Sequence, residues 1–508
     1  MLDLLDIPTP WGSPFIGLGH LLQMALHVSN GHEQFLKWHE VYGPIVRLRL
    51  LYRDVVIVAD PQVASELLGK GPNECPRRTP EYTLFNAAHG MPGYGAILTE
   101  QDEERWKAIR RAIAPAFTLS AVRDLFPTIV TCYSEVCKRI SSGEAVHYSK
   151  PRSSSSSSSS SEPEVLIDEE IFAATLRVLS DGFLRMPQQG LFDAHKTAAD
   201  ASSLIAITNT FVTQPWKRWL YLGMPWLCKE SRTFHAQRRH MMSVTHQIAQ
   251  HIESLRPTAS AADFSLGASL SRLREPSSGQ LFSTQALQAE VFLEIVGQES
   301  VPWTVAWTLY LLTQHPEAEQ AVLQELVAAG LPCNGDLAAV TAALSMDSLR
   351  QLPFLIAVLH EAMRLFPAGV AATPRMCEKV TKVGPYQVPA GVIVFPCLYS
   401  ILNYSANWDS PQQFKPERWQ DPSAATDPRT GSPRFVPFGI GPKACVAQQL
   451  AMVQCKVLLV LLLSCFSWRL APRMGGPQGV LSQTVAALEL RVAQGMWLTP
   501  TPRSAAAQ

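Results

Sequence analysis

The stretch FGIGPKACVA at residues 438–447 decides how the rest of this sequence is interpreted. Its glycines and proline favour a tight turn, and the apolar residues that follow predict a helix over about residues 447–466. The turn places Cys445 at the N-terminus of that helix, where the helix dipole and the exposed N–H groups favour the thiolate. Small residues on both sides of Cys445 leave room for a flat cofactor to approach the backbone. The stretch therefore predicts a reactive cysteine beside a cofactor, with a buried structural cysteine as the alternative.

The composition is that of a large and rather apolar globular protein. The 508 residues include 43 basic and 43 acidic side chains, with 47% hydrophobic and 17% charged residues. Such a composition excludes a mainly disordered chain, and a formal net charge of zero argues against nucleic acid as the main partner. Ten cysteines, none with zinc-ligand spacing, are too few for a disulfide scaffold, so we expect most to be buried hydrophobes in a reducing compartment. Length alone suggests roughly three domains.

Helical periodicity dominates the chain. It predicts helices over most of residues 102–366, including a long one from Thr284 to about Gln314. Shorter segments rich in β-branched or alternating apolar residues predict strands at 45–50, 55–59 and 370–397. Nine consecutive serines, Ser153–Ser161, cannot build a core and predict a solvated surface insertion. The fold class is therefore mainly α with small β-sheets (α+β).

The sequence predicts no membrane-spanning or targeting segment. No window of ~18 consecutive apolar residues occurs, and the longest apolar run, Val457–Leu463, predicts a core helix. The N-terminal residues contain Pro, Gly and His and lack the basic region of a signal peptide, so we expect no transmembrane anchor in this sequence. Residues 215–226 mix aromatic and basic side chains, which predicts peripheral contact with a membrane or, equally, a packed helix–helix corner.

The stretch at 438–447 closely resembles the haem-binding loop of cytochrome P450 enzymes, F-x-x-G-x-[RK]-x-C-x-[GA]. The resemblance implies that Cys445 is the metal ligand, binding the iron of a b-type haem as a thiolate. It also implies that Phe438 belongs to the cofactor-binding loop and that Lys443 pairs with a haem propionate. Lysine is a point charge at a position where the family more often has arginine or histidine. Ala447 stands where the family favours glycine.

Two segments upstream resemble the part of the family that braces this loop. Glu361-Ala362-Met363-Arg364 places a glutamate and an arginine on one face of a helix, and FKPERW at 414–419 contributes Arg418. The resemblance implies a buried Glu-Arg-Arg network of Glu361, Arg364 and Arg418 that is structural and necessary for haem retention. A surface ion pair of little worth is the alternative for Glu361 and Arg364 alone.

Three residues are candidates for binding the haem propionates. WKAIR at 106–110 has Trp106 and Arg110 one helical turn apart, and the resemblance implies that both donate to propionates. A stacked surface pair is the alternative for these two residues. Arg375, which follows the Leu-Phe-Pro sequence at 365–367, resembles a further propionate-binding position.

The segment VGQES at 296–300 resembles the oxygen-activation motif [AG]-G-x-[DE]-T. The resemblance implies that Glu299 and Ser300 are catalytic, because an acid beside a hydroxyl on a distorted helix can relay protons from solvent. Gly297 and Pro302 favour such a distortion. Two departures from the motif matter: Ser300 replaces a threonine and loses stiffness at χ1, and Val296 crowds the space over the iron. An ordinary polar stripe on a core helix is the alternative.

The ordered motifs surround one site and therefore predict one large domain with a cytochrome P450-like fold that encloses the haem, instead of three domains. We expect this domain over residues 31–500, with the surface insertion at 151–163. A Pro- and Gly-rich segment at 1–30 precedes it, and a disordered tail at 501–508 follows.

The resemblance implies a haem-thiolate monooxygenase that inserts one atom of O2 into a lipophilic organic substrate and reduces the other to water. The sequence contains no nucleotide or flavin motif, so electrons are expected from a separate partner, either NADPH-cytochrome P450 reductase or a ferredoxin. In the family an acidic donor binds the face that Arg105, Lys107 and Arg111 would occupy here, although a solvated helix face would also explain them.

Two other functions stay open from sequence alone. A P450-type isomerase or dehydratase rearranges a peroxide without external electrons, and a non-catalytic protein could bind haem or act as a sensor on the same fold. We expect a monomer that is membrane-associated, at the endoplasmic reticulum or in a plastid, or cytoplasmic.

Overall fold

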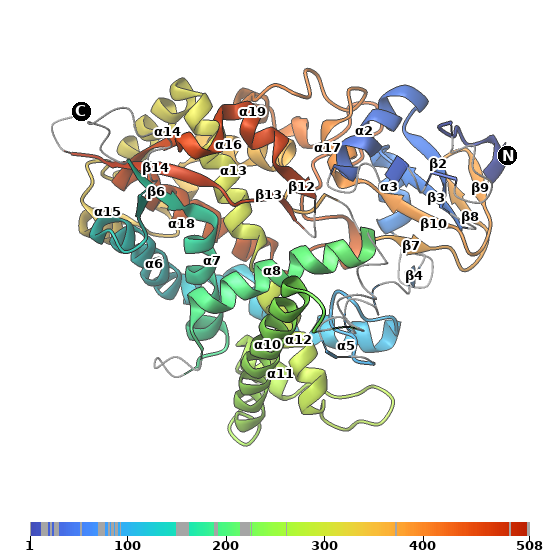
Figure 1. The fold of residues 1–508 in the computed structure, drawn as a ribbon, viewed down its shortest axis with the longest axis horizontal. Helices are drawn as coiled ribbons and strands as arrows, with labels where there is room; N and C mark the ends of the chain where they lie inside the picture. The colour runs from blue at the N-terminus through green and yellow to red at the C-terminus, as the bar shows by residue number, and fades with distance from the viewer. Residues whose placement is uncertain are drawn as a thin grey trace.

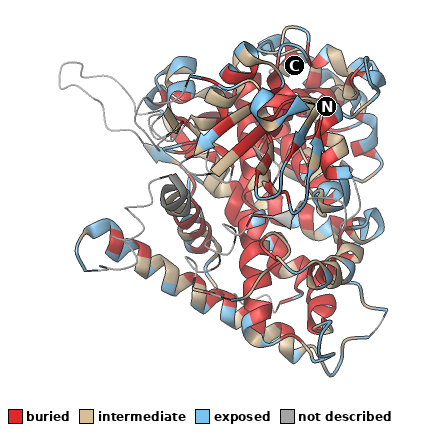
Figure 2. Ribbon diagram, turned by 90° about the vertical axis from the view of Figure 1, so that its right-hand side faces the viewer, coloured by how far each residue is buried: buried red, intermediate tan, exposed pale blue. Residues whose placement is uncertain are grey.

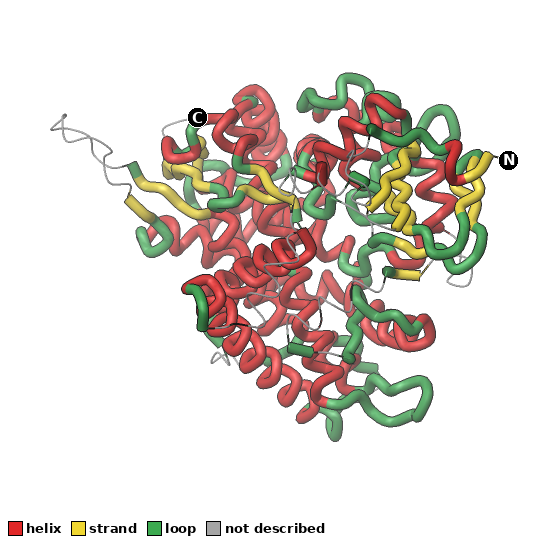
Figure 3. Tube along the Cα trace, turned by 45° about the vertical axis from the view of Figure 1, so that its right-hand side comes forward, coloured by secondary structure: helices red, strands yellow, loops and turns green. Residues whose placement is uncertain are grey.

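The computed structural model shows a mainly helical molecule with small sheets (Figure 1; Figure 3). It describes residues 2–11, 19–20, 23–24, 30–50, 53–69, 77–79, 82, 86, 90–91, 93–148, 162–186, 192–213, 224, 226–260, 262–370, 373–486 and 489–504. The predicted fold class, mainly α with small β-sheets, is confirmed. The serine tract at 153–161 and nearly all of segment 215–226 lie outside the described residues.

A five-stranded sheet lies near the N-terminus. Its order is β2 (Ile45–Leu50), β3 (Arg53–Val58), β10 (Ile393–Pro396), β7 (Arg375–Met376) and β4 (Arg77–Arg78). β10 runs parallel to β3 and joins residues that are far apart in sequence. Helix α2 (Gly31–Tyr42) packs Trp38 against this sheet, and α3 (Pro61–Gly69) packs Leu67 and Leu68 against it. A smaller sheet contains β1 (Leu2–Asp3), β9 (Tyr386–Val388) and β8 (Thr381–Val383).

The remaining helices form the bulk of the molecule. They are α5 (Glu103–Ile113), α6 (Leu119–Ser142), α7 (Ile167–Arg177), α8 (Ala194–Thr213), α10 (Lys229–Ser254), α11 (Leu266–Ser271), α12 (Thr284–Gly297), α13 (Ser300–Gln314), α14 (Pro316–Ala328), α15 (Leu337–Ala343), α16 (Pro353–Leu365), α17 (Leu398–Asn403), α18 (Gln448–Cys465) and α19 (Gly476–Ser482). α13 and α18 are apolar on every face, which is the pattern of a fully buried helix. Buried residues accordingly run through the middle of the molecule (Figure 2).

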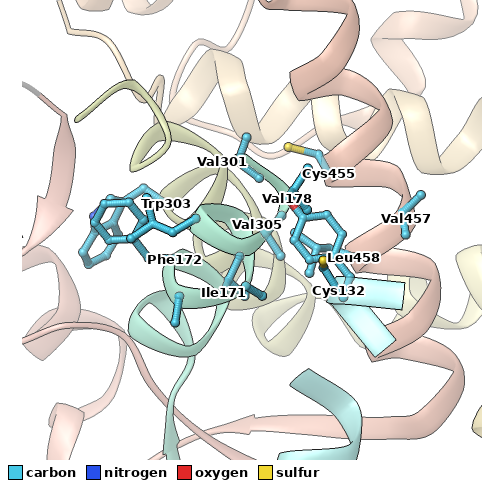
Figure 4. Close-up of a cluster of buried hydrophobic side chains, with 14 of the residues drawn as sticks. Cys132, Ile171, Phe172, Val178, Val301, Trp303, Val305, Cys455, Val457 and Leu458 are labelled. Atoms are coloured by element: carbon cyan, nitrogen blue, oxygen red, sulfur yellow. The ribbon is translucent and has the colours of Figure 1, made fainter. Parts of the chain in front are cut away.

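The core is one large cluster in which α7, α13 and α18 meet. Figure 4 shows Phe172 of α7 beside Trp303 of α13, and Leu458 of α18 on the other side of the same cluster. α18 is long and apolar enough to cross a membrane, but 72% of it is buried inside the molecule, as the prediction of a core helix requires. Among the described residues, the pair Glu103–Phe117 and Leu119–Ser142 passes the same length and hydropathy test only together, with a 57° bend.

Two sheets complete the C-terminal part. β11 (Phe466–Leu470), β14 (Trp497–Pro502), β6 (Pro163–Leu166) and β5 (His147–Tyr148) form one, and β12 (Thr484–Ala486) and β13 (Leu490–Val492) form the other. β14 continues to Pro502, two residues past the predicted end of the domain. The backbone N–H of Arg503 also donates to the Cys465 carbonyl at 2.9 Å. The packed part of the chain therefore extends into the segment that the sequence assigned to a disordered tail.

Candidate active site

The loop before α18 is held in a fixed shape by its backbone. Gly441 has φ +76°, and a Cβ atom there would lie 2.0 Å from the carbonyl oxygen of Leu68 in α3. Only glycine fits this position, because it tolerates the left-handed conformation and the close approach of another backbone. The N–H of Cys445 donates to the carbonyl of Phe438 at 2.8 Å and closes the loop. The local sequence thus fixes where the cysteine side chain lies.

Cys445 differs from the other cysteines in its surroundings. Of the nine cysteines that the structure describes, it alone is exposed, and it is exposed to an interior cavity. Burial in the protein raises the pKa of the Cys445 thiol, while a hydrogen bond from the N–H of Ala447 and the nearby Arg110 charge act to lower it. The expectation that the helix terminus favours the thiolate is therefore outweighed by desolvation in this state. A bound metal cation removes the proton from a coordinating thiol.

Glu361 is the centre of a buried hydrogen-bond network behind this loop. Arg364 contacts it through Nε and Nη2 at 3.0 and 2.9 Å, and Arg418 Nε donates to both of its oxygens at 3.0 and 3.1 Å. Trp419 Nε1 and the N–H of Lys415 each add a hydrogen bond at 3.0 Å. The side chains of Glu361 and Arg364 are fully buried, so the surface-pair alternative does not apply.

Arg364 ties this network to the segment that leads to the cysteine loop. Its Nη1 donates to the carbonyls of Leu402 and Pro411 at 3.1 and 2.7 Å, and its Nη2 donates to that of Gln413 at 3.2 Å. One guanidinium thus joins α16, α17 and the irregular segment at 411–418. The geometry is that of a brace, as the sequence predicts.

The cavity beside Cys445 has a volume of about 380 Å³ and brings together segments from most of the chain. Seven of the eight predicted site residues line it: Trp106, Arg110, Ser300, Arg375, Phe438, Lys443 and Cys445. Most of the other lining side chains are apolar, among them Leu98, Phe117, Leu293, Val301 and Leu450. The exception is Glu299, whose side chain turns away from the cavity.

Two donors on α5 point into the cavity without a protein acceptor. The buried Trp106 Nε1 has no hydrogen-bond partner among the described residues. The Arg110 guanidinium, one turn along, forms no ion pair with any described residue, and burial lowers its pKa. An unpaired indole N–H and an unpaired cation beside a single thiol suit a ligand with carboxylate groups on one edge. The residues present therefore fit a haem, whose propionates would satisfy both donors.

Lys443 lies on the cavity but already has protein partners. Its ammonium forms an ion pair with Glu103 of α5 and lies 4.7 Å from the centroid of the Trp106 ring. A propionate would have to share this ammonium with Glu103. Lys443 therefore ties the cysteine loop to α5 in the described structure, a contact that the sequence interpretation did not include.

Arg105 also differs from its predicted place on a basic surface. Its guanidinium donates to Glu275 at 3.0 Å and to the carbonyl of Gly95 at 2.8 Å, and pairs with Glu100. The side chain is 15% exposed, because these partners draw it inward. Lys107 pairs with Glu104 at 2.6 Å, and Arg111 is exposed.

The predicted long helix is interrupted at the oxygen-activation segment. α12 ends at Gly297 and α13 starts at Ser300. The N–H groups of Gln298 and Glu299 bond carbonyls three residues earlier, at 3.2 Å each, instead of four. Pro302 has no N–H to offer to the Gln298 carbonyl, which explains why the α-helical pattern fails here. The predicted distortion is present, and the Ser283 hydroxyl caps α12 by accepting from the Ala286 N–H at 3.3 Å.

Ser300 is the hydroxyl that lines the cavity at this break. Its Oγ donates to the Gly297 carbonyl at 3.0 Å, and Thr304, one turn on, donates to the Ser300 carbonyl at 2.8 Å. A Cβ atom on Gly297 would have no neighbour within 4 Å. Open space therefore adjoins Ser300, even though Val296 also lines the cavity.

Sequence reasoning missed two carboxylates that line this cavity. The Glu294 side chain of α12 makes no hydrogen bond or ion pair with the described residues, and burial raises its pKa to about 7. Glu489 reaches the cavity from the turn between β12 and β13. Glu294 could have been suspected as an acid inside an apolar helix. Glu489 carries no local signal, because a long-range contact places it.

Comparisons with known proteins agree with this geometry. The family model of cytochrome P450 matches residues 8–486. Cytochrome P450 76M5 of Oryza sativa subsp. japonica is 28% identical over 94% of this chain and 87% of its own length, and human cytochrome P450 3A5 is 25% identical over 92% and 86%.

A solved structure shows the same fold. The retinoic acid-bound cyanobacterial CYP120A1 has a TM-score of 0.73 at 18% identity and covers 99% of this chain and 100% of its own. Because the family model spans most of the chain, the family assignment does not depend on any single motif. This chain belongs to the cytochrome P450 family and is a haem b-dependent, haem-thiolate monooxygenase.

Proposed function

We propose that this enzyme inserts one oxygen atom of O2 into a lipophilic small molecule, with Cys445 as the axial ligand of the haem iron and Glu299 and Ser300 as the catalytic acid and hydroxyl. One observation carries the proposal: Cys445 and Ser300 line the same largely apolar cavity. Haem b, when bound, supplies the iron at which O2 is activated. The protein's task is then to hold the cofactor, exclude bulk water and deliver protons.

The chain's own residues divide this task between them. Trp106 and Arg110 offer unpaired donors to the propionates, with Arg375, Phe438 and Lys443 beside them. Ser300 holds its hydroxyl proton on the Gly297 carbonyl and can turn it toward an acceptor in the cavity.

The apolar lining supports a lipophilic substrate, since burial of apolar surface is the main source of affinity in such a cavity. Family members receive electrons from a redox partner, and we infer NADPH-cytochrome P450 reductase or a ferredoxin here. Trp226 and Leu227, at the end of the predicted interfacial segment, are 69% and 56% exposed, which supports peripheral membrane contact.

The test is NADPH-supported oxygen consumption by haem-loaded protein with a reductase, in the presence of candidate lipophilic substrates. The proposal predicts oxygenated product, and it predicts that Ser300→Ala releases more of the consumed oxygen as hydrogen peroxide. Turnover of a peroxide without NADPH, together with no NADPH-supported consumption, would instead identify the isomerase-type reaction.

A further inference from the structure

Glu299, the predicted catalytic acid, lies beside a second carboxyl group that lines the cavity. Its Oε1 accepts from the Ser202 hydroxyl of α8 at 2.5 Å and from Arg491 Nη1 of β13 at 3.5 Å. Its side chain is 1% exposed, and it does not line the cavity. Glu489, in contrast, lines the cavity, and its side chain neighbours that of Glu299.

The place of Glu489 is fixed by its neighbours. Glu489 forms a backbone bridge with Gly369, and the N–H of Leu490 donates to the Ala368 carbonyl at 2.9 Å. The Leu490 carbonyl in turn accepts from Trp307 Nε1 of α13 at 2.9 Å. Figure 1 shows α8, α13 and β13 close to one another in the centre of the molecule. The Glu489 carboxyl is therefore held between the cavity and Glu299.

A hydrogen bond between two carboxyl groups requires a proton on one of them, because a carboxylate can only accept. Oε2 of Glu299 and Oε2 of Glu489 are both buried and have no hydrogen-bond partner among the described residues, and a proton held between the two side chains would satisfy both. Arg491 can balance one negative charge at this place. On this geometry we propose that Glu299 and Glu489 share a single proton, and that Glu489 is the residue of the pair that passes it to the cavity.

The electrostatic surroundings of Glu489 support a shared proton. Burial, followed by the charge of Glu299, raises the pKa of Glu489 well above its usual value, and Arg491 acts to lower it. Burial raises the pKa of Asp168 of α7 to about 7, and the charge of Glu299 adds a smaller contribution. Asp168 Oδ1 accepts from the Met496 N–H at 2.7 Å. Burial near a single guanidinium thus disfavours the charged form of both Asp168 and Glu489.

The proton balance of the transfer is simple. Glu489 gives one proton to an acceptor in the cavity and is left as a carboxylate beside Arg491. Glu299 then takes one proton from solvent at the partly exposed Ser202 and Arg491 side, and the pair returns to its one-proton state. The net result is one proton moved from solvent to the cavity, with no change in redox state.

This inference rests on the proposed monooxygenase function, but its first test does not. Infrared difference spectra of haem-loaded protein near neutral pH report the C=O stretch of protonated carboxyl groups. Glu489→Gln should remove one equivalent of this band, and the double variant with Glu299→Gln should remove no more than one. Loss of two equivalents in the double variant, or of none in Glu489→Gln, would overturn the shared proton. Glu290 is a buried acid that does not line the cavity. Adding Glu290→Gln to Glu489→Gln should therefore remove a second equivalent of the C=O band.

The second test measures proton delivery. With retained haem, Glu489→Gln should release several-fold more hydrogen peroxide per NADPH than the parent and should change the pH profile of coupling. Glu489→Asp should restore part of the coupling, whereas Glu290→Gln should couple like the parent. An unchanged peroxide fraction and pH profile in Glu489→Gln would overturn the delivery role. If the parent itself consumes no oxygen with NADPH, the proposed function fails while the infrared result stands on its own.

Discussion

The two sides of the cavity are built in opposite ways. Behind Cys445, the Glu361 carboxylate has four hydrogen bonds from arginine donors, plus one from Trp419 and one from the Lys415 N–H. Across the cavity, the carboxyls of Glu294 and Glu489 face the interior with almost no donors. A saturated network stabilises one geometry, whereas carboxyls with few partners keep their protons and can exchange them.

The largest effect is expected where the network is broken. Arg364→Ala leaves Glu361 buried beside carbonyls that lose their donor, which should destabilise the protein by about 3–5 kcal/mol. The variant should be recovered mostly without haem, as measured by the ratio of Soret to protein absorbance. Arg350→Ala is the matched control, because its ion pair with Asp347 is largely exposed and should matter little. If Arg364→Ala kept the haem content and melting temperature of the parent, the bracing role would be refuted.

A smaller effect is expected in the cysteine loop, where two glycine substitutions separate the clash with α3 from the cost of a positive φ. Gly441→Ala meets the Leu68 carbonyl, while Gly431→Ala has a similar φ of +71° and no neighbour within 4 Å. The left-handed conformation should lower the free energy of unfolding of both variants by about 1–2 kcal/mol. The clash should lower that of Gly441→Ala by about 1–3 kcal/mol more. Chemical unfolding of the two variants measures the difference. Equal losses would show that the approach of α3 does not fix the loop.

The smallest effect concerns Glu290, a buried acid of α12 that does not line the cavity. Burial raises the pKa of Glu290 to about 8, although its Oε2 accepts from the Ile97 N–H at 3.2 Å. A carboxyl whose pKa is higher in the folded than in the unfolded state binds its proton more tightly when folded. Stability is therefore lost as pH rises from the unfolded pKa toward about 8.

Glu290→Gln should remove this loss. Between about pH 7 and about pH 9 the free energy of unfolding of the parent should fall by on the order of 1 kcal/mol more than that of the variant. Melting temperatures across this range measure it. In Glu317→Gln, at an exposed carboxyl, the melting temperature should depend on pH as it does in the parent. A Glu290→Gln variant with the slope of the parent would contradict the raised pKa.

The cysteine side could be predicted from sequence because its contacts follow short motifs. Glu361 and Arg364 are one helical turn apart, and the loop at 438–447 determines its own turn. The break after Gly297 was likewise predictable, since Pro302 removes a specific helical hydrogen bond.

The other residues depend on contacts that no local pattern encodes. Glu489 reaches the cavity through a bridge to Gly369, which is 120 positions away. Lys443 is paired by Glu103, and Arg105 is drawn inward by Glu275, in both cases across long sequence separations. The orientation of Glu299 away from the cavity follows from Ser202 and Arg491. Motifs predict where the backbone of these residues lies, while long-range contacts determine the orientation of their charged side chains.

The central claim is that Cys445 holds the haem iron as a thiolate. The most direct measurement is the absorption spectrum of the reduced protein with carbon monoxide, for the parent and for Cys445→Ala, with Cys465→Ala as the control at a buried cysteine of α18 that does not line the cavity. We expect the red-shifted Soret band of a thiolate-ligated haem in the parent and in Cys465→Ala, and its loss in Cys445→Ala. A parent without this band, or a Cys445→Ala variant that keeps it, would contradict the account.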